Sequence, residues 1–255
     1  MKQPILEVRK LQKSFGGLRA LDGINLDIHE GEVVGLIGPN GAGKTALLNT
    51  VTGFYRATGG TILFQNQDIT HRPMHEIGRL GIGRTFQNIR LFRRMTVLEN
   101  ALVAFRPFAD HPLRSLIAYR ERRMAIARAM HWLELLQLAD KVDRIASSLS
   151  YGDARRLEIA RALVGEPSLL LLDEPAAGMN ENETRRLVDD IAIVRRHVRA
   201  IVLIEHDMDL IRSLSDRLVA MDYGRKIVEG ASAEVLNHPE VLKAYLGTDT
   251  EETVS

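Results

Sequence analysis

A glycine-rich stretch is the part of the sequence whose residue types and spacing point most directly to chemistry. It follows the apolar segment 33–37 and precedes 44–51, which has helical composition. In such a strand-loop-helix unit, backbone N–H groups curl around phosphate oxygens and the helix N-terminus adds its positive end. Lys44 would reach the outer phosphates, and Thr45 would offer its hydroxyl to Mg²⁺. The pattern G-x-x-x-x-G-K-[ST] therefore predicts a phosphate-binding loop (P-loop) made of Gly38, Pro39, Asn40, Gly41, Ala42, Gly43, Lys44 and Thr45.

Two adjacent carboxylates form the second candidate feature. Asp173 and Glu174 follow the apolar run 169–172, which has the composition of a buried strand. Because parallel strands end at one edge of a sheet, the acids should converge with the P-loop on one phosphate group. We expect Asp173 to hold Mg²⁺ and Glu174 to act as general base toward the attacking water. For Asp173 taken alone, a capping acid after a strand is an equal alternative.

Two further polar residues fit the same edge. Gln87 follows Gly83-Arg84-Thr85-Phe86, and His206 lies just beyond the predicted strand 200–204. An amide at this place can sense Mg²⁺ and water, and an imidazole can contact the terminal phosphate. Each residue alone also fits a structural role, since a His at a strand end is more often simply hydrogen-bonded. Their common position favours a catalytic role for both.

Composition limits the classes of function. The chain has 255 residues, of which 34 are basic and 33 acidic, and it has no cysteine. The near balance of charge gives no reason to expect nucleic acid as a partner. The lack of cysteine excludes disulfides, thiolate catalysis and cysteine-ligated metals. No apolar run approaches the ~20 residues of a membrane-spanning helix and no secretory signal is visible, so we expect a soluble, cytoplasmic protein.

The elements that must position these residues follow from hydrophobic periodicity. Alternating segments at 5–11, 20–28 and 32–37 predict strands and an antiparallel start. Residues 96–139 carry apolar side chains at three- and four-residue steps, which indicates an inserted helical lobe.

After Ser150, helices and strands alternate as in a parallel α/β sheet. The expected elements there are a helix to about 164, a strand at 169–172, a helix at 182–196, a strand at 200–204, a hairpin at Tyr223-Gly224 and a helical tail at 233–246.

The segment LSYGD at 149–153, followed by RRLEIARAL at 155–163, resembles the signature of ATP-binding cassette (ABC) proteins, which usually reads LSGGQ. Ser150 and Gly152 keep the phosphate-contacting positions, ahead of a helix N-terminus. Taken alone, the segment reads as a Ser-capped helix. With the P-loop, the acid pair, Gln87 and His206 in ABC order and spacing, the resemblance covers nearly the whole chain.

The resemblance implies an α/β fold of the P-loop NTPase class. Its parts would be a RecA-like parallel-sheet core, an antiparallel β subdomain and an inserted helical subdomain. The whole chain, 1–255, would be one ABC nucleotide-binding domain. Its catalytic core would comprise 1–87 and 165–232, its helical and signature subdomain 88–164, and its C-terminal tail 233–255.

The resemblance also implies ATP and Mg²⁺ as cofactors, with Thr45, Gln87 and Asp173 at the metal. In ABC proteins each ATP lies between the P-loop of one subunit and the signature of its partner. Ser150 would therefore serve the opposite site, and hydrolysis would require a dimer. Phe15 resembles the aromatic residue that stacks on adenine, with core packing as an equal alternative. Residues 176–180 lie where the family's D-loop crosses to the other subunit.

A narrower resemblance, to branched-chain amino acid importer ATPases, rests on RTFQNIRLF at 84–92, MTVLEN at 95–100 and HPEVLKAYLG at 238–247. It implies a second ATPase, two membrane permeases and, indirectly, a periplasmic binding protein. The chain would then lie peripherally on the inner face of the cell membrane. An arginine cluster would lie near the groove that receives the permeases; its members are Arg84, Arg90, Arg93 and Arg94.

One nucleotide-contacting position departs from the family. Ala46 stands where the family usually has a second hydroxyl residue, next to Thr45. The missing hydroxyl would be expected to donate to the α-phosphate.

Three other functions compete with this interpretation. A non-transport ABC protein would carry long coiled coils or two cassettes, which this chain lacks. A regulatory module without hydrolysis conflicts with the presence of Glu174, Gln87 and His206. An ABC cassette for another cargo, such as urea or a lipid, stays open because the permease and binding protein select the cargo.

Overall fold

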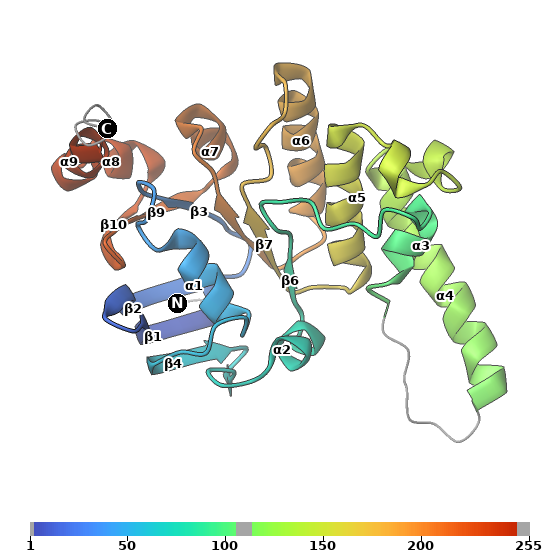
Figure 1. The fold of residues 1–255 in the computed structure, drawn as a ribbon, viewed down its shortest axis with the longest axis horizontal. Coiled ribbons are helices and arrows are strands. Elements are labelled where there is room, and N and C mark those ends of the chain that lie inside the picture. The colour runs from blue at the N-terminus through green and yellow to red at the C-terminus, as the bar shows by residue number, and fades with distance from the viewer. Residues whose placement is uncertain (1–2, 106–113, 249–255) are drawn as a thin grey trace.

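The larger of two β-sheets contains the two strands, 169–173 and 200–204, whose ends carry the candidate catalytic residues. The protein is seen in a computed structural model that describes residues 3–105 and 114–248. Its larger sheet has the strand order β10-β9-β3-β8-β7-β6 (Figure 1). Neighbouring strands are parallel except β9 and β10. In that order, the bounds are Arg225–Gly230, Arg217–Asp222, Val33–Ile37, Ala200–Ile204, Leu169–Asp173 and Ile82–Arg84.

A smaller sheet, antiparallel throughout, covers the N-terminal part of the chain. Its order is β2-β1-β4-β5. The bounds are Leu18–His29, Pro4–Phe15, Gly59–Phe64 and Gln67–Asp68. The predicted antiparallel start and the predicted α/β class are therefore confirmed, and the expected hairpin at Tyr223-Gly224 joins β9 to β10.

The two faces of the parallel sheet pack against different helices. Side chains alternate across a strand, so Leu169 and Leu171 of β7 face one way while Leu170 and Leu172 face the other. The first pair belongs to the core cluster that contains α1 (Lys44–Val51) and the antiparallel sheet. The second pair belongs to the cluster that contains α5 (Tyr151–Val164). Figure 1 accordingly shows α1 and α5 on opposite sides of β7.

The expected helical lobe is more divided than its periodicity suggested. Within 96–139 the described residues form α3, α4 and a 3₁₀ turn, and residues 106–113 of the lobe lie outside the described part of the chain. Helix α3 begins at a capping box, in which Thr96 accepts from the Glu99 N–H and Glu99 from the Thr96 N–H. The bounds are Val97–Leu102, Arg114–Leu135 and Ala139–Lys141, with a second 3₁₀ turn at Ala146–Ser148.

The remaining helices lie at the ends of sheet strands and in the tail. Their bounds are Met74–Leu80 (α2), Glu181–Val194 (α6), Met208–Leu214 (α7), Ser232–Leu236 (α8) and Pro239–Thr248 (α9). The single expected tail helix is thus two helices. Pro239 is the first residue of α9 and has no backbone N–H, so it favours the start of a new helix after Asn237, the C-cap of α8. Within the described residues, no helix is long and apolar enough to cross a bilayer.

Candidate active site

The P-loop links β3 to α1, and its glycines are required by close approach and by backbone conformation. A Cβ on Gly38 would lie 2.1 Å from the Met221 carbonyl oxygen, and Gly43, with φ 100°, is the N-cap of α1. A Cβ on Gly41 would meet no other atom, so packing does not require glycine there; its φ of 80°, a left-handed backbone conformation, does. The first turn of α1 leaves N–H groups without intrahelical partners, which suits a phosphate.

Lys44 is the first residue of α1, and its side chain folds back onto the P-loop. The side chain is buried, and its ammonium donates to the carbonyl oxygens of Gly38 and Pro39, the latter at 2.9 Å from Nζ. Burial lowers the pKa of Lys44, while Glu174 and Asp173 oppose that change. The two carbonyl oxygens thus hold the Lys44 ammonium inside the P-loop.

Asp173, the last residue of β7, forms a buried ion pair that the sequence did not predict. Its Oδ2 lies 2.8 Å from a guanidinium nitrogen of Arg84. Arg84 also donates to Asn49 Oδ1 at 2.7 Å and to Thr52 Oγ1 at 3.1 Å, at the end of α1. Burial raises the pKa of Asp173, and Arg84 opposes this. Arg84 therefore connects the P-loop helix to the acid strand.

Asp173 also keeps one oxygen that fits a metal-bound water. Its Oδ1 is buried and has no hydrogen-bond partner among the described residues. A buried acceptor of this kind is costly unless something donates to it. Water on a Mg²⁺ ion would donate, and the hydroxyl of Thr45 lies exposed in the first turn of α1, so the donor set suits this cation.

Glu174 is the residue on which the predicted catalytic side chains converge. Gln87 Nε2 donates to its Oε2 at 2.7 Å, and His206 Nε2 lies 2.7 Å from its Oε1. If His206 donates here, the proton is on Nε2. The backbone of Glu174 has φ 47°, a left-handed conformation that non-glycine residues rarely adopt and that tends to occur at functional sites. The carboxylate is held at both oxygens.

The expected D-loop is held by a carboxylate that the sequence analysis overlooked. Glu205, between β8 and His206, accepts the Ala176 N–H at 2.7 Å and is buried. Burial raises the pKa of Glu205, with backbone donors opposing it. Its position one residue before the candidate His206 was the available signal.

Phe15, at the end of β1, is not part of the core. It is 43% exposed, which argues against the core-packing alternative. Its ring lies edge-on to Tyr55, with centroids 4.9 Å apart, and Lys13 Nζ lies 4.5 Å from its centroid. An exposed aromatic surface remains available to a flat ligand.

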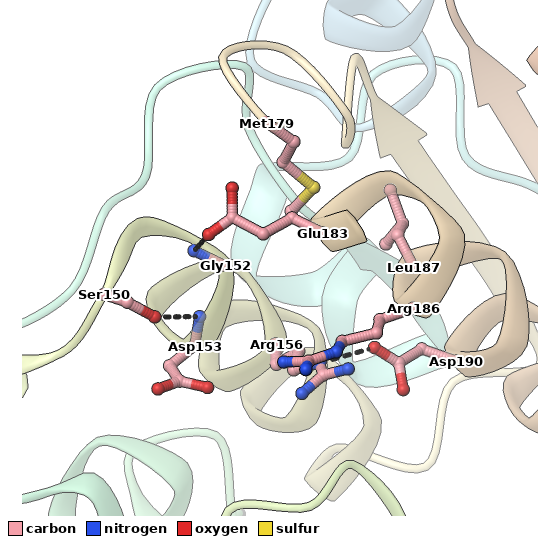
Figure 2. Close-up of a pocket in the computed structure, with 9 residues that line it drawn as sticks. All are labelled: Ser150, Gly152, Asp153, Arg156, Met179, Glu183, Arg186, Leu187 and Asp190. Atoms are coloured by element: carbon pink, nitrogen blue, oxygen red, sulfur yellow. Dashed lines mark hydrogen bonds and ion pairs between the residues drawn. The ribbon is translucent and has the colours of Figure 1, made fainter. Parts of the chain in front are cut away.

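The signature residues make their contacts away from the P-loop. Ser150 caps α5, its Oγ accepting from the Asp153 N–H at 3.2 Å. The Gly152 N–H donates to Glu183 Oε1 at 3.3 Å, and the other oxygen of Glu183 accepts the Asn180 N–H. Figure 2 shows this contact above a small pocket between α5 and α6, where Arg156 pairs with Asp190 at 2.7 Å. Ser150 and Gly152 both line this pocket, and their hydrogen bonds go to Asp153 of α5 and Glu183 of α6.

A fully buried arginine connects the signature helix to the segment around Gln87, and the sequence analysis missed it. Arg155 donates to the carbonyl oxygens of Phe86 at 2.6 Å and Gln87 at 2.7 Å, and it pairs with Glu158 at 2.8 Å. Glu158 Oε1 in turn accepts the Arg90 N–H at 3.2 Å. The backbone around Gln87 is therefore held from α5.

Of the four arginines expected near the permease groove, Arg84 is buried inside the protein. Its side chain is 6% exposed because the buried Asp173 and the polar end of α1 supply its partners. Arg90 lies over the ring of Phe86, 4.4 Å from the centroid. Arg93 and Arg94 are exposed, next to the half-exposed Phe92.

Comparison with known proteins gives the family of the chain. The ABC transporter family model matches residues 21–177, and a model described as branched-chain amino acid ATP-binding cassette transporter matches 225–251. The high-affinity branched-chain amino acid transport ATP-binding protein LivG of Escherichia coli K12 is 47% identical over 97% of this chain and 99% of its own length. BraF of Pseudomonas aeruginosa has the same identity and coverage.

Solved structures give the same assignment. A nucleotide-free ATP-binding cassette from an ABC transporter has a TM-score of 0.84 at 35% identity, covering 95% of this chain and 99% of that one. The ADP conformation of the cassette MJ1267 has a TM-score of 0.85 at 35% identity, covering 96% and 100%. The P-loop NTPase fold expected from the sequence is confirmed. The chain belongs to the ABC transporter family, as an ATP-binding and ATP-hydrolysing subunit of the group that includes LivG and BraF.

Proposed function

We propose that this chain powers the import of branched-chain amino acids by hydrolysing ATP with Glu174 as general base. The observation that carries the catalytic part is the Glu174 carboxylate, held between Gln87 and His206 at 2.7 Å from each. Identity to LivG and BraF across nearly the whole chain supports the cargo.

In this proposal Glu174 takes a proton from the attacking water as the water oxygen bonds to the terminal phosphorus. The bond from that phosphorus to the bridging oxygen breaks, so ADP leaves with the electron pair and inorganic phosphate forms. Gln87 and His206 orient the carboxylate, and Lys44 neutralises charge on the outer phosphates. Bound Mg²⁺ would supply further positive charge, with Thr45, Asp173 and the amide oxygen of Gln87 as its neighbours. Phe15 stacks on the adenine, and the N–H groups of the P-loop and α1 surround the phosphates.

Ser150 and Gly152 contact ATP held by the P-loop of a partner ATPase, so the active unit is a dimer of this chain or of this chain with a related one. The dimer works beneath two membrane permeases, fed by a periplasmic binding protein, on the inner face of the cell membrane. No nucleic acid takes part.

The division of the chain also stays a proposal. It assigns 1–87 and 165–232 to the catalytic core with its β subdomain, 88–164 to the helical and signature subdomain, and 233–255 to the tail. The packing of α3, α4 and α5 on one another supports the second unit, and their core cluster continues into strands β3, β7 and β8.

Reconstitution tests the cargo. The chain, its permeases and its partner ATPase are placed in proteoliposomes with the binding protein, and ATP hydrolysis is measured with each cargo. We expect stimulation by leucine, isoleucine and valine, which the Glu174→Gln variant abolishes. By calorimetry, the isolated chain should bind ATP but not leucine. Stimulation by urea or a lipid instead, with none by the three amino acids, would overturn the cargo assignment.

A further inference from the structure

A residue of the last helix contacts the first residue of the P-loop. The Gly38 N–H donates to the Tyr245 hydroxyl at 2.7 Å, across 207 residues of sequence. The Gly38 carbonyl oxygen accepts from the ammonium of Lys44. Both backbone polar groups of this one glycine are therefore used, one toward the tail and one toward the phosphate-binding lysine.

The helix that carries Tyr245 is docked on the core. Val241 lies one turn earlier on the same face of α9 and is 2% exposed, within the core cluster that also contains Val235 of α8. Burial raises the pKa of the Tyr245 hydroxyl, so the group stays neutral over the working range of pH. Figure 1 shows α8 and α9 side by side, next to the edge of the larger sheet that ends in β9 and β10.

The β9–β10 hairpin, which precedes the tail helices, makes a second hydrogen bond to the P-loop. In the β9–β10 hairpin, the Gly224 N–H donates to the Ala42 carbonyl oxygen at 3.0 Å. The model for branched-chain amino acid cassettes matches 225–251, which holds β10 and both tail helices. The segment that characterises this branch is thus the segment that reaches Gly38.

We propose that Tyr245 is a positioning residue: it holds Gly38, and through Gly38 the ammonium of Lys44, so that the C-terminal helix sets the affinity of the P-loop for nucleotide. This rests on the proposed role of the P-loop and goes beyond it by assigning a task to the tail. Gly38 is buried, so its N–H has little access to water as a substitute acceptor.

The effect should fall on both ATP and ADP, because the P-loop surrounds phosphates that both nucleotides carry. It should be at least as large for ATP, since Lys44 reaches the outer phosphates and ADP lacks the terminal one. A neutral hydrogen bond of ordinary strength corresponds to a factor of about two to ten in an equilibrium constant. In the assembled transporter we expect KM for ATP to rise by a similar factor, with kcat nearly unchanged.

The test compares Tyr245→Phe with two controls in the full chain. Tyr223→Phe removes the hydroxyl of an 83% exposed tyrosine in the neighbouring hairpin, and Val235→Ala loosens the packing of α8. Affinity for ATP and ADP is measured by calorimetry, and unfolding by thermal denaturation. Tyr245→Phe should weaken both nucleotides about two- to tenfold, Tyr223→Phe should change neither property, and Val235→Ala should lower Tm without weakening nucleotide binding.

Two results would overturn the proposal. One is wild-type affinity in Tyr245→Phe; the other is a loss of affinity in Val235→Ala that matches its loss of Tm, since the role of the tail would then be general stability. Failure of the wild-type chain itself to bind ATP would instead refute the proposed function.

Discussion

The catalytic edge around Glu174 and the signature end of α5 differ in where their contacts go. At the catalytic edge, two side chains from distant segments, Gln87 and His206, meet on the Glu174 carboxylate, and Lys44 lies near it. At the signature end, Ser150 caps its own helix and the Gly152 N–H is taken by Glu183 of the adjacent α6. The first region is completed by residues of one chain. In the second, a carboxylate of α6 occupies the Gly152 N–H, so a partner's phosphate would have to displace Glu183 to reach it.

The difference suggests how the two regions communicate. Arg155 lies on α5 behind the signature and holds the backbone carbonyls of Phe86 and Gln87. Gln87 in turn donates to Glu174. A displacement of α5 would therefore reach Glu174 through one buried guanidinium.

The largest effect is expected at the catalytic edge. Glu174→Gln keeps the shape of the side chain but removes the proton acceptor, so turnover in the assembled complex should fall by about 10²–10⁴-fold. ATP binding should persist. Single-turnover hydrolysis and nucleotide affinity are measured together.

Lys44→Ala is the matched contrast, because it should lose ATP binding itself. Near-full turnover in Glu174→Gln would exclude this residue as the base.

The next largest effect, on the free energy of unfolding, is expected at Arg155, which links the two regions. Arg155→Met leaves the buried Glu158 with Arg161, 3.8 Å away, as its remaining cationic partner, and it removes the donor to the Phe86 and Gln87 carbonyl oxygens. Breaking a buried pair in this way costs up to about 3–5 kcal/mol of unfolding free energy. The double variant Arg155→Met, Glu158→Met removes both charges and should lose clearly less. Denaturant unfolding of the wild type, both single variants and the double variant gives the coupling. Additive losses would mean that the pair is not a unit.

A smaller effect, on nucleotide affinity alone, is expected at the first turn of α1. Ala46 is half-buried in the first turn of α1. Ala46→Thr should tighten ATP and ADP by several-fold and at most about tenfold, because ~1.4 kcal/mol corresponds to a factor of ten. Saturating turnover should hardly change, since a contact to the α-phosphate is present throughout the reaction.

Nucleotide titration of both variants checks this, with Ala162→Thr on α5 as the control. Unchanged affinity would mean that backbone N–H groups and water already satisfy the α-phosphate.

The smallest effect is a pH dependence at Glu205. Because its folded pKa is raised above that of the unfolded chain, the native state binds more protons just above pH 4.5, and stability falls as pH rises through the folded pKa. Glu205→Gln removes this term while keeping an acceptor for the Ala176 N–H. The Tm difference, variant minus wild type, should be more positive at pH 8 than at pH 5. The exposed Glu234→Gln should show no such trend, and a trend of opposite sign would contradict the assignment.

The sequence predicted the residues at the strand ends well because each follows a strand with a clear local pattern. The apolar runs 169–172 and 200–204 place Glu174 and His206 at one edge by the rules of parallel sheets. The short elements between 59 and 84 were not predicted, since β5 has two residues and β6 has three.

Buried charges were the other limit. Arg84 looks like an ordinary surface residue in the sequence because Asp173 lies 89 residues away. For Arg155, the nearby Glu158 predicts only a helix-surface pair, and the Phe86 carbonyl that it reaches lies 69 residues away. Periodicity reports which face of an element is apolar, and it carries no information on which charge finds a partner inside. The same holds for Tyr245, whose contact with Gly38 depends on how α9 docks.

Single-site nucleotide trapping tests most directly the claim that the two regions serve different ATP molecules. A Ser150→Arg subunit is assembled with a wild-type partner that can be told apart, and trapped nucleotide is assigned to each P-loop. The account predicts that trapping fails at the partner's P-loop and persists at Lys44 of the variant subunit. Selective loss at Lys44 of the variant subunit would contradict it, since Ser150 would then serve its own site.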